Sequence, residues 1–242
     1  MTAPNTATLQ GSVDRQQRAQ EFVRQVLEVC AGSKRAQADL RSGLGLPYDR
    51  CQRMHRHLMR LVPERNRHPE ARRPYYVVAA LIAARSRGVR DEDAERNSAA
   101  PTQGDASPSE PGGTAQSWWQ RPNLGASLAE AVNLGALAAG SAESELHLLA
   151  RVGSESLHSR LPALVGQVNG RGVVLDWAVL LDDLAGWDYS QDRIATRWLE
   201  SYFRVRDAAE RAAERGQAEL PAADGHSNDS NDSNDAFSEE KQ

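Results

Sequence analysis

The sequence lacks the marks of a membrane, secreted or metal-binding protein. Its longest apolar run, Val77 to Ala84, is far too short to cross a bilayer, and its first residues lack the basic-then-apolar build of a signal peptide. The two cysteines, Cys30 and Cys51, have no CxxC spacing, and each falls on the apolar face of its own expected helix. We interpret them as small buried hydrophobes. We therefore expect a soluble, cytoplasmic protein without membrane contact, cofactor or metal site.

Catalytic signatures are also missing. The chain has no HExxH, Walker A, GxSxG or dinucleotide-binding glycine pattern. Glu155 and His158 have the spacing of half a di-iron motif, but no second Glu-x-x-His accompanies them. Asp182 and Asp183 are adjacent, so on a helix they point about 100° apart, and we interpret them as a solvated or interface-facing edge. The sequence therefore argues against an enzyme.

Lysine is nearly absent, since only Lys34 and Lys241 among the 29 basic residues are lysines. A GC-rich genome alone produces this bias, so the placement of the arginines is more informative than their excess. Residues 15–90 contain 17 basic and 6 acidic side chains, whereas residues 91–242 contain 12 and 26. This segregation indicates that the first part meets a polyanion, while the acidic remainder keeps the molecule soluble.

Large apolar side chains are scarce in three segments. Residues 1–12, 91–116 and 216–242 are polar, and the last includes three consecutive Ser-Asn-Asp triplets. Such segments cannot bury enough surface to offset the entropy lost on ordering. We therefore expect a disordered N-terminus, a flexible acidic linker and a disordered acidic tail. These segments would bound a basic N-terminal helical bundle at 13–90 and a C-terminal helical bundle at 117–215.

Helical periodicity is strongest over residues 154–205, where the apolar positions repeat through three successive segments. The first expected helix starts near Ser154 and contains Pro162, where we expect a kink or a restart. Asp176 is placed to cap a second helix that Gly186 would end, and a third would open at Asp188 or Ser190. This pattern predicts an all-α fold.

Three aromatic residues, Trp177, Trp198 and Tyr202, fall on the apolar faces of the second and third of these helices. We expect them to meet between the two helices. Because each ring lies at the buried period, we interpret the stripe as core packing rather than as a platform for stacking bases.

A basic face is predicted on the helix expected from Pro47 to Val62. Its apolar residues share one arc, and the opposite arc carries five basic residues and no carboxylate: Arg50, Arg53, Arg56, His57 and Arg60. A helix face that meets only water normally mixes both signs of charge. The pattern therefore favours contact with phosphates, and partner carboxylates or plain solvation are the alternatives.

Two further pairs of basic residues lie near predicted helix starts. Ser33 is placed to cap a short helix that begins with Lys34 and Arg35, where exposed N–H groups favour an anion; a solvated loop is the alternative. Arg72 and Arg73 lie in a proline-bounded loop before a nearly apolar helix, Tyr75 to Arg87. We expect that helix at the centre of the N-terminal bundle.

Six segments share an order and spacing with a known family: GSKRAQADLR at 32–41, YYVVAALIA at 75–83, NLG at 123–125, SESLHSRL at 154–161, LDWAVLLDDLAGW at 175–187 and RWLESY at 197–202. Together they cover roughly residues 14 to 206. This ordered set resembles the CasB family, the small subunit of the type I-E CRISPR complex Cascade.

The resemblance implies a two-bundle, all-α protein without enzymatic activity, present in two copies. It would contact the backbone and large subunits of Cascade and steady the hybrid of guide RNA and target DNA. It would also hold the displaced strand, so that the R-loop is stabilised in antiviral defence. The family's basic residues are matched by Lys34, Arg35, Arg41 and Arg160 and more weakly by Arg151, whereas Ala126 stands where many members carry a basic residue.

We therefore predict a non-catalytic Cascade subunit that binds sugar–phosphate backbones. Its candidate contacts are Lys34, Arg35, Arg41, Arg50, Arg53, Arg56, Arg60, Arg72, Arg73, Arg151 and Arg160. Two other classes stay open. A stand-alone helical DNA-binding regulator would need a recognition helix and a dimer face, and a protein-only scaffold subunit would direct its arginines to carboxylates.

Overall fold

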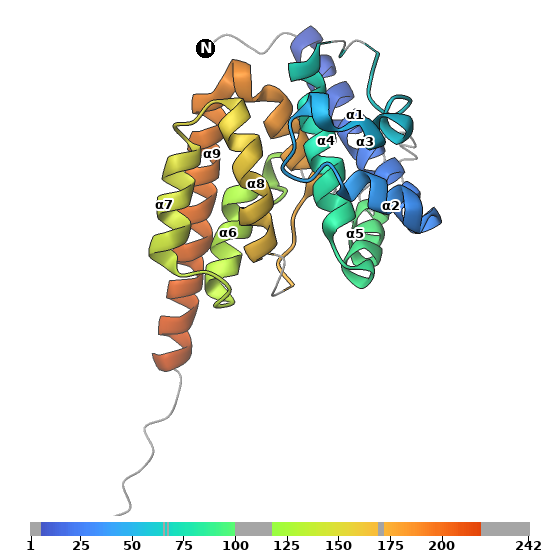
Figure 1. Ribbon diagram of the computed structural model, residues 1–242. Helices are drawn as coiled ribbons and strands as arrows, with labels where there is room; N and C mark the ends of the chain where they lie inside the picture. Colours follow the sequence, from blue (N-terminus) through green and yellow to red (C-terminus); the bar gives the residue numbers. More distant parts are fainter. Residues whose placement is uncertain (1–5, 65, 67, 100–117, 169–171, 219–242) are drawn as a thin grey trace, which may run out of the picture.

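A computed structural model of the 242-residue chain describes residues 6–64, 66, 68–99, 118–168 and 172–218. Every regular element within these ranges is helical, which confirms the all-α expectation (Figure 1). The elements are α1 (Thr6–Gly32), α2 (Lys34–Arg41), the 3-10 turn η1 (Tyr48–Arg50), α3 (Gln52–Leu58), α4 (Pro69–Ala84), α5 (Arg87–Ala99), the 3-10 turn η2 (Trp118–Gln120), α6 (Leu124–Asn133), α7 (Ala139–Leu149), α8 (Ser154–Val168) and α9 (Trp177–Ala218).

Helix α4 is the centre of the N-terminal half, as expected. Its Val78, Ala79 and Ile82 are completely buried, and α1, α2 and η1 pack around it. The helix begins at Pro69 instead of Tyr75, because a proline in the first turn needs no hydrogen-bond partner for its nitrogen.

Helix α9 is one long helix with a break at Ser190, whose φ of −146° and ψ of 30° are not helical. Asp176 caps its start, since Asp176 Oδ1 accepts a hydrogen bond from the Val179 N–H at 3.0 Å. The expected cap and the opening near Ser190 are therefore confirmed. The expected stop at Gly186 is wrong, because the helix continues through this residue.

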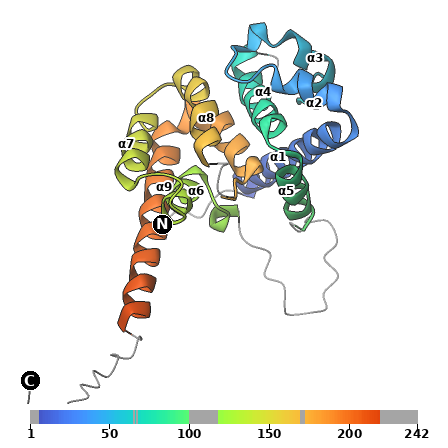
Figure 2. The same ribbon diagram turned by 60° about the horizontal axis from the view of Figure 1, so that its bottom comes forward.

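The two halves of the chain share α9. This helix packs against α6 and α7 of the C-terminal half and against α1 and α4 of the N-terminal half (Figures 1 and 2). The buried side chains of the described residues form one continuous cluster that includes Phe22, Ile82, Leu128 and Trp187. The division into two bundles therefore stays a prediction.

The helices extend into segments that the composition suggests are unstructured. Helix α1 begins at Thr6, and α5 extends to Ala99, so parts of 1–12 and 91–116 are helical. The remainder of those two segments and residues 219–242 of the tail lie outside the described residues. The domain boundaries stay predictions.

The aromatic stripe is core, as interpreted, but its members pair differently from the prediction. Trp198 lies against Trp187, with ring centroids 4.9 Å apart. Trp177 turns instead to the N-terminal half, where its Nε1 donates a hydrogen bond to Asp93 of α5 at 2.9 Å and its ring lies 5.3 Å from the Arg85 guanidinium. The expected meeting of Trp177 with Trp198 is therefore wrong, and Trp177 joins the halves.

Asp183 is likewise not at a solvated edge. Its side chain is 3% exposed and accepts hydrogen bonds from Arg197 and, at 2.7 Å, from Trp198 Nε1 across the α9 break. Burial raises the pKa of Asp183 to about 6, although Arg197 and Trp198 oppose that rise. The adjacent Asp182 pairs with Arg15 of α1 at 2.5 Å. Both carboxylates therefore hold helices together.

Cys30 and Cys51 are buried free thiols, which agrees with their interpretation as small hydrophobes. Burial raises the pKa of Cys30 to about 11, so this thiol is a poor metal ligand. In the described ranges no group of three His, Cys, Asp or Glu side chains is arranged to hold a metal ion. None of the helices described there has an apolar stretch long enough for a bilayer.

Candidate nucleic-acid interface

The basic face predicted around residue 55 exists, although its backbone is not one helix. Residues 48–50 form η1, and Cys51, with φ −84° and ψ 41°, separates it from α3. Arg60 lies in the turn that follows α3. The expected continuous helix from Pro47 to Val62 is therefore wrong, because the Cys51 backbone turns between its two parts.

Burial still divides this segment as the helical pattern predicts. Met54 and Leu58 are fully buried against the N-terminal core, and Cys51 and Val62 are also buried. The four arginines on the other side are all exposed: Arg50, Arg53, Arg56 and Arg60. Within the described part of the chain, none of these four forms an ion pair with a carboxylate.

One carboxylate does reach the edge of this face, from α2. Asp39 Oδ2 lies 3.0 Å from His57 Nε2, and this contact lowers the pKa of Asp39, with smaller contributions from Arg56 and Arg35. Asp39 therefore connects α2 to α3, and Arg35 and Arg56 both lie near it. The sequence pattern missed this pairing, because it compares residues on a single helix.

Helix α2 begins as predicted. The extended Ser33 accepts a hydrogen bond from the Ala36 N–H at 3.2 Å through its hydroxyl. Lys34 and Arg35 are exposed in the first turn, and Arg41 is exposed in the last. Arg35 lies near Arg56, since both act on Asp39. We name the exposed basic residues of α2, η1, α3 and the turn after α3 the basic face: Lys34, Arg35, Arg41, Arg50, Arg53, Arg56 and Arg60.

Arg72 and Arg73 lie in α4, not in the loop before it. Arg72 donates hydrogen bonds to the Asn66 carbonyl at 2.6 Å and to the Tyr48 hydroxyl at 3.1 Å, and the second bond raises the pKa of Arg72. These two hydrogen bonds connect the start of α4 to Asn66 and to η1. Arg73 is half-buried and lies close enough to His158 of α8 to help lower the pKa of that imidazole.

Arg151 and Arg160 lie in the C-terminal half. Arg151 is exposed in the turn between α7 and α8. Arg160 is exposed on α8, with its Nη1 3.7 Å from Glu145 Oε1 of α7. The structure therefore does not bring these two residues into the basic face, which α2, η1 and α3 form at the opposite end of the molecule from α7 (Figures 1 and 2).

The basic face suits the recognition of backbones rather than bases. Guanidinium groups bind phosphate oxygens through two parallel N–H donors and need no sequence information to do so. Six exposed arginines supply such donors from short, packed elements, and Lys34 adds a further cation. Chemically, these donors can bind phosphate groups.

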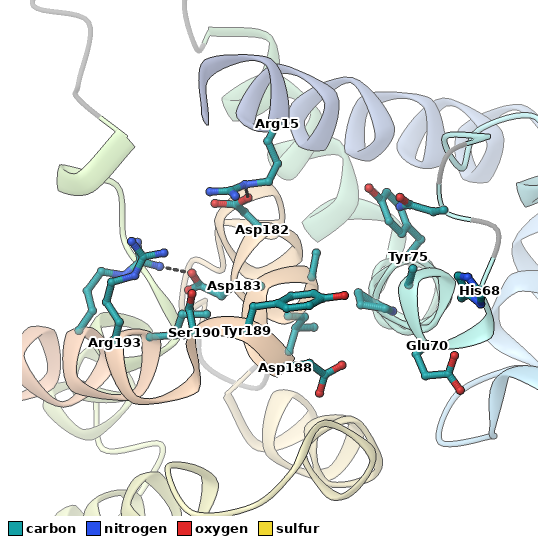
Figure 3. A pocket seen from close by; sticks show the side chains of 18 of the residues that line it. Arg15, His68, Glu70, Tyr75, Asp182, Asp183, Asp188, Tyr189, Ser190 and Arg193 are labelled. Atoms are coloured by element: carbon teal, nitrogen blue, oxygen red, sulfur yellow. Dashed lines mark hydrogen bonds and ion pairs between the residues drawn. The ribbon is translucent and has the colours of Figure 1, made fainter. Parts of the chain in front are cut away.

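A pocket of about 880 Å³, which the sequence does not predict, lies at the bend of α9 (Figure 3). Its walls come from α1, the start of α4 and both parts of α9, so no single segment indicates it. The one signal in the sequence is Tyr189, which stands outside the apolar repeat next to the break at Ser190 and is 90% exposed.

Comparisons with known proteins place the chain among CRISPR-associated proteins. The family model described as CRISPR-associated protein Cse2 matches residues 36–203. A chain of a solved CRISPR RNA-guided surveillance complex is 31% identical, with a TM-score of 0.65, and the match covers 82% of this chain and 99% of that one. A chain of a surveillance complex described as pre-nicking is 33% identical, with the same TM-score, and the match covers 82% and 98%.

A crystal structure of a Cse2-family protein from Thermus thermophilus has a similar fold at 21% identity, with a TM-score of 0.50 and a match over 76% of this chain and 97% of that one. A comparison with curated protein sequences finds no match. The fold and the family match thus define an all-helical protein of the CRISPR-associated class. The chain belongs to the Cse2 family, which is also called CasB, so the family resemblance in its sequence is confirmed.

Proposed function

We propose that this chain is the non-catalytic small subunit of a type I-E CRISPR RNA-guided surveillance complex. It binds the sugar–phosphate backbones of the guide RNA–target DNA hybrid and of the displaced DNA strand. The observation that carries this proposal is the basic face, where Arg50, Arg53, Arg56 and Arg60 are exposed and form no ion pair with a described carboxylate. The similarity to chains of two surveillance complexes supports it.

The physical effect would be to shift the equilibrium between the DNA duplex and the R-loop towards the R-loop. The RNA–DNA hybrid of an R-loop is about as stable as the DNA duplex that it replaces, so modest backbone contacts shift the equilibrium. Exposed guanidinium groups supply such contacts without reading bases. Binding is therefore tolerant of sequence and falls steeply as salt rises.

The proposal includes the partners that such a subunit needs. These are the guide RNA, both strands of the target DNA, the backbone and large subunits of the complex, and a second copy of this chain. We place the complex in the cytoplasm. Arg72 is the weakest of the candidate nucleic-acid contacts, because its guanidinium already binds Asn66 and Tyr48.

The test is co-expression of the full chain with a guide RNA and the proteins encoded beside it, followed by purification through a tag on another subunit. We expect the chain to co-purify with RNA, and ultraviolet cross-linking with target DNA to map to peptides that contain Arg53 or Arg56. Co-purification without any nucleic-acid cross-link would favour the protein-only scaffold. A footprint on bare duplex DNA, made by the chain alone, would favour the stand-alone regulator.

A further inference from the structure

The pocket at the bend of α9 has a distinct set of chemical groups. Arg15 of α1, Glu70 of α4 and Asp188, Tyr189 and Arg193 of α9 line it (Figure 3). It lies outside the basic face, since none of that face's residues lines it. The proposed nucleic-acid contacts therefore leave it unexplained.

Half of the carboxylates of the pocket are already engaged. Asp182 pairs with Arg15, and Asp183 pairs with Arg197 and Trp198. Glu70 and Asp188 are exposed, and neither forms an ion pair with any residue of the described ranges. With four carboxylates against three guanidinium groups, the walls have a formal balance of one negative charge. The unengaged carboxylates therefore favour a cation.

Tyr189 adds an aromatic face to these carboxylates. The residue is 90% exposed, and its ring reaches from α9 across the pocket towards α4, with Asp188 and Glu70 below it in the view of Figure 3. An aromatic face beside a carboxylate is a favourable place for a guanidinium, which stacks on the ring and donates hydrogen bonds to the oxygens. The pocket has room for such a side chain together with the loop that carries it.

We propose that this pocket receives an arginine from a loop of another protein subunit. The guanidinium stacks on Tyr189 and pairs with Asp188 and Glu70, so the contact fastens the partner at the junction of the two halves. This inference rests on the proposed membership of a multisubunit complex. A nucleic-acid strand is the competing occupant, but its phosphates would meet Glu70 and Asp188, which repel them.

The test uses the full chain co-expressed with the guide RNA and the partner subunits, as above. Tyr189 is replaced by the photo-crosslinking amino acid p-benzoylphenylalanine, and the cross-linked product is mapped by mass spectrometry. We expect a cross-link to a protein loop that contains an arginine. In a second arm, the double variant Glu70→Lys, Asp188→Lys should be recovered with the complex about tenfold less well than wild type. Exchange of the mapped arginine for glutamate should restore its recovery.

The control variant is Glu155→Lys, Glu214→Lys, which makes the same change of charge at two exposed glutamates outside the pocket. It should be recovered like wild type, and circular dichroism should show all variants folded. A cross-link from position 189 to RNA or DNA, or undiminished recovery of the pocket variant, would overturn the arginine site alone. Failure of the wild-type chain to co-purify would overturn the proposed function together with this inference.

Discussion

Gly125 of α6 lies directly against the main-chain carbonyl of Trp198 of α9: a Cβ atom on Gly125 would stand 1.8 Å from that oxygen. The neighbouring Asn123 caps α6, because its Oδ1 accepts the Ala126 N–H at 3.1 Å, and its Nδ2 donates to Ser201 Oγ at 2.9 Å. Leu124 is fully buried. The Asn-Leu-Gly motif therefore holds two helices at close range.

Substitution of Gly125 by alanine should force α6 away from α9. Because a backbone atom cannot move aside cheaply, we expect Gly125→Ala to lower the free energy of unfolding by about 3 kcal/mol. Gly166→Ala is the control, since nothing lies within 4 Å of a Cβ at this exposed position inside α8. It should raise the free energy of unfolding by about 0.5 kcal/mol. Urea denaturation followed by circular dichroism measures both, and equal effects would contradict the close contact.

Removal of the Asp183 carboxylate should loosen the α9 bend. Asp183→Ala leaves Arg197 without its carboxylate and the Trp198 Nε1–H without an acceptor in a buried site. We expect the free energy of unfolding to fall by about 3 kcal/mol. Asp192→Ala, at an exposed aspartate of the same helix, should change it by less than about 0.5 kcal/mol. If Asp183→Ala lowered the free energy of unfolding no more than Asp192→Ala, the contacts of Asp183 with Arg197 and Trp198 would not stabilise the bend.

His158 should make stability depend on pH. Burial, aided by Arg73, lowers the pKa of His158 to about 4, and neither ring nitrogen has a hydrogen-bond partner. The folded chain therefore holds this imidazole neutral. Its contribution to stability is complete above the unfolded pKa of about 6.5 and is lost as pH falls towards about 4.

We expect His158→Leu to be more stable than wild type at pH 7, and its advantage to grow by about 3 kcal/mol as pH falls from 7 to 4. Asp183 acts in the opposite direction, because its raised pKa favours the folded chain at low pH. Because Asp183 is present in both proteins, its contribution cancels in the difference between their free energies of unfolding. Thermal unfolding at several pH values provides the measurement, and a constant difference would argue against a neutral buried imidazole.

The basic face should set the salt dependence of nucleic-acid binding. Each phosphate contact on a single strand contributes about 0.7 to the slope of log affinity against log salt, so Arg53→Ala, Arg56→Ala and Arg60→Ala together should reduce that slope by about 2. Fluorescence anisotropy with a labelled single-stranded oligonucleotide measures it.

The matched control for that triple variant is Arg204→Ala, Arg211→Ala, Arg215→Ala, which removes the same charge from the exposed end of α9. Its slope should stay close to that of wild type. If the Arg53, Arg56, Arg60 triple variant kept the wild-type salt slope with unchanged circular dichroism, these arginines of the basic face would have no part in binding.

Local signals in the sequence predicted the buried faces and the caps. The Asp176 and Ser33 caps were predictable because each is a short-range hydrogen bond between neighbours in the chain. The expected stop at Gly186 was wrong for a related reason. The low helix propensity of glycine is a small local cost, and here Trp187 and Leu184 on either side are buried in the core, which outweighs it.

Partners across the fold could not be predicted in this way. Periodicity indicates that Trp177 and Trp198 are buried, but the way in which helices cross decides which rings meet. Asp183 and Asp39 are similar cases, since each finds its partner on a distant turn or on another helix. The exposure of Arg50, Arg53, Arg56 and Arg60 was predictable from the local apolar pattern, whereas the contacts of Arg72 with Asn66 and Tyr48 were not.

Because helices of both halves pack against α9, the N-terminal half cannot bury all of its apolar surface without this helix. A fragment that ends at Ala99 would leave α1 and α4 without the neighbours that α9 supplies to them. Mixing this fragment with residues 118–218 would then restore the missing surface in trans. Association of the two fragments would show that the packing of α9 against α1 and α4 is strong enough to join separate chains.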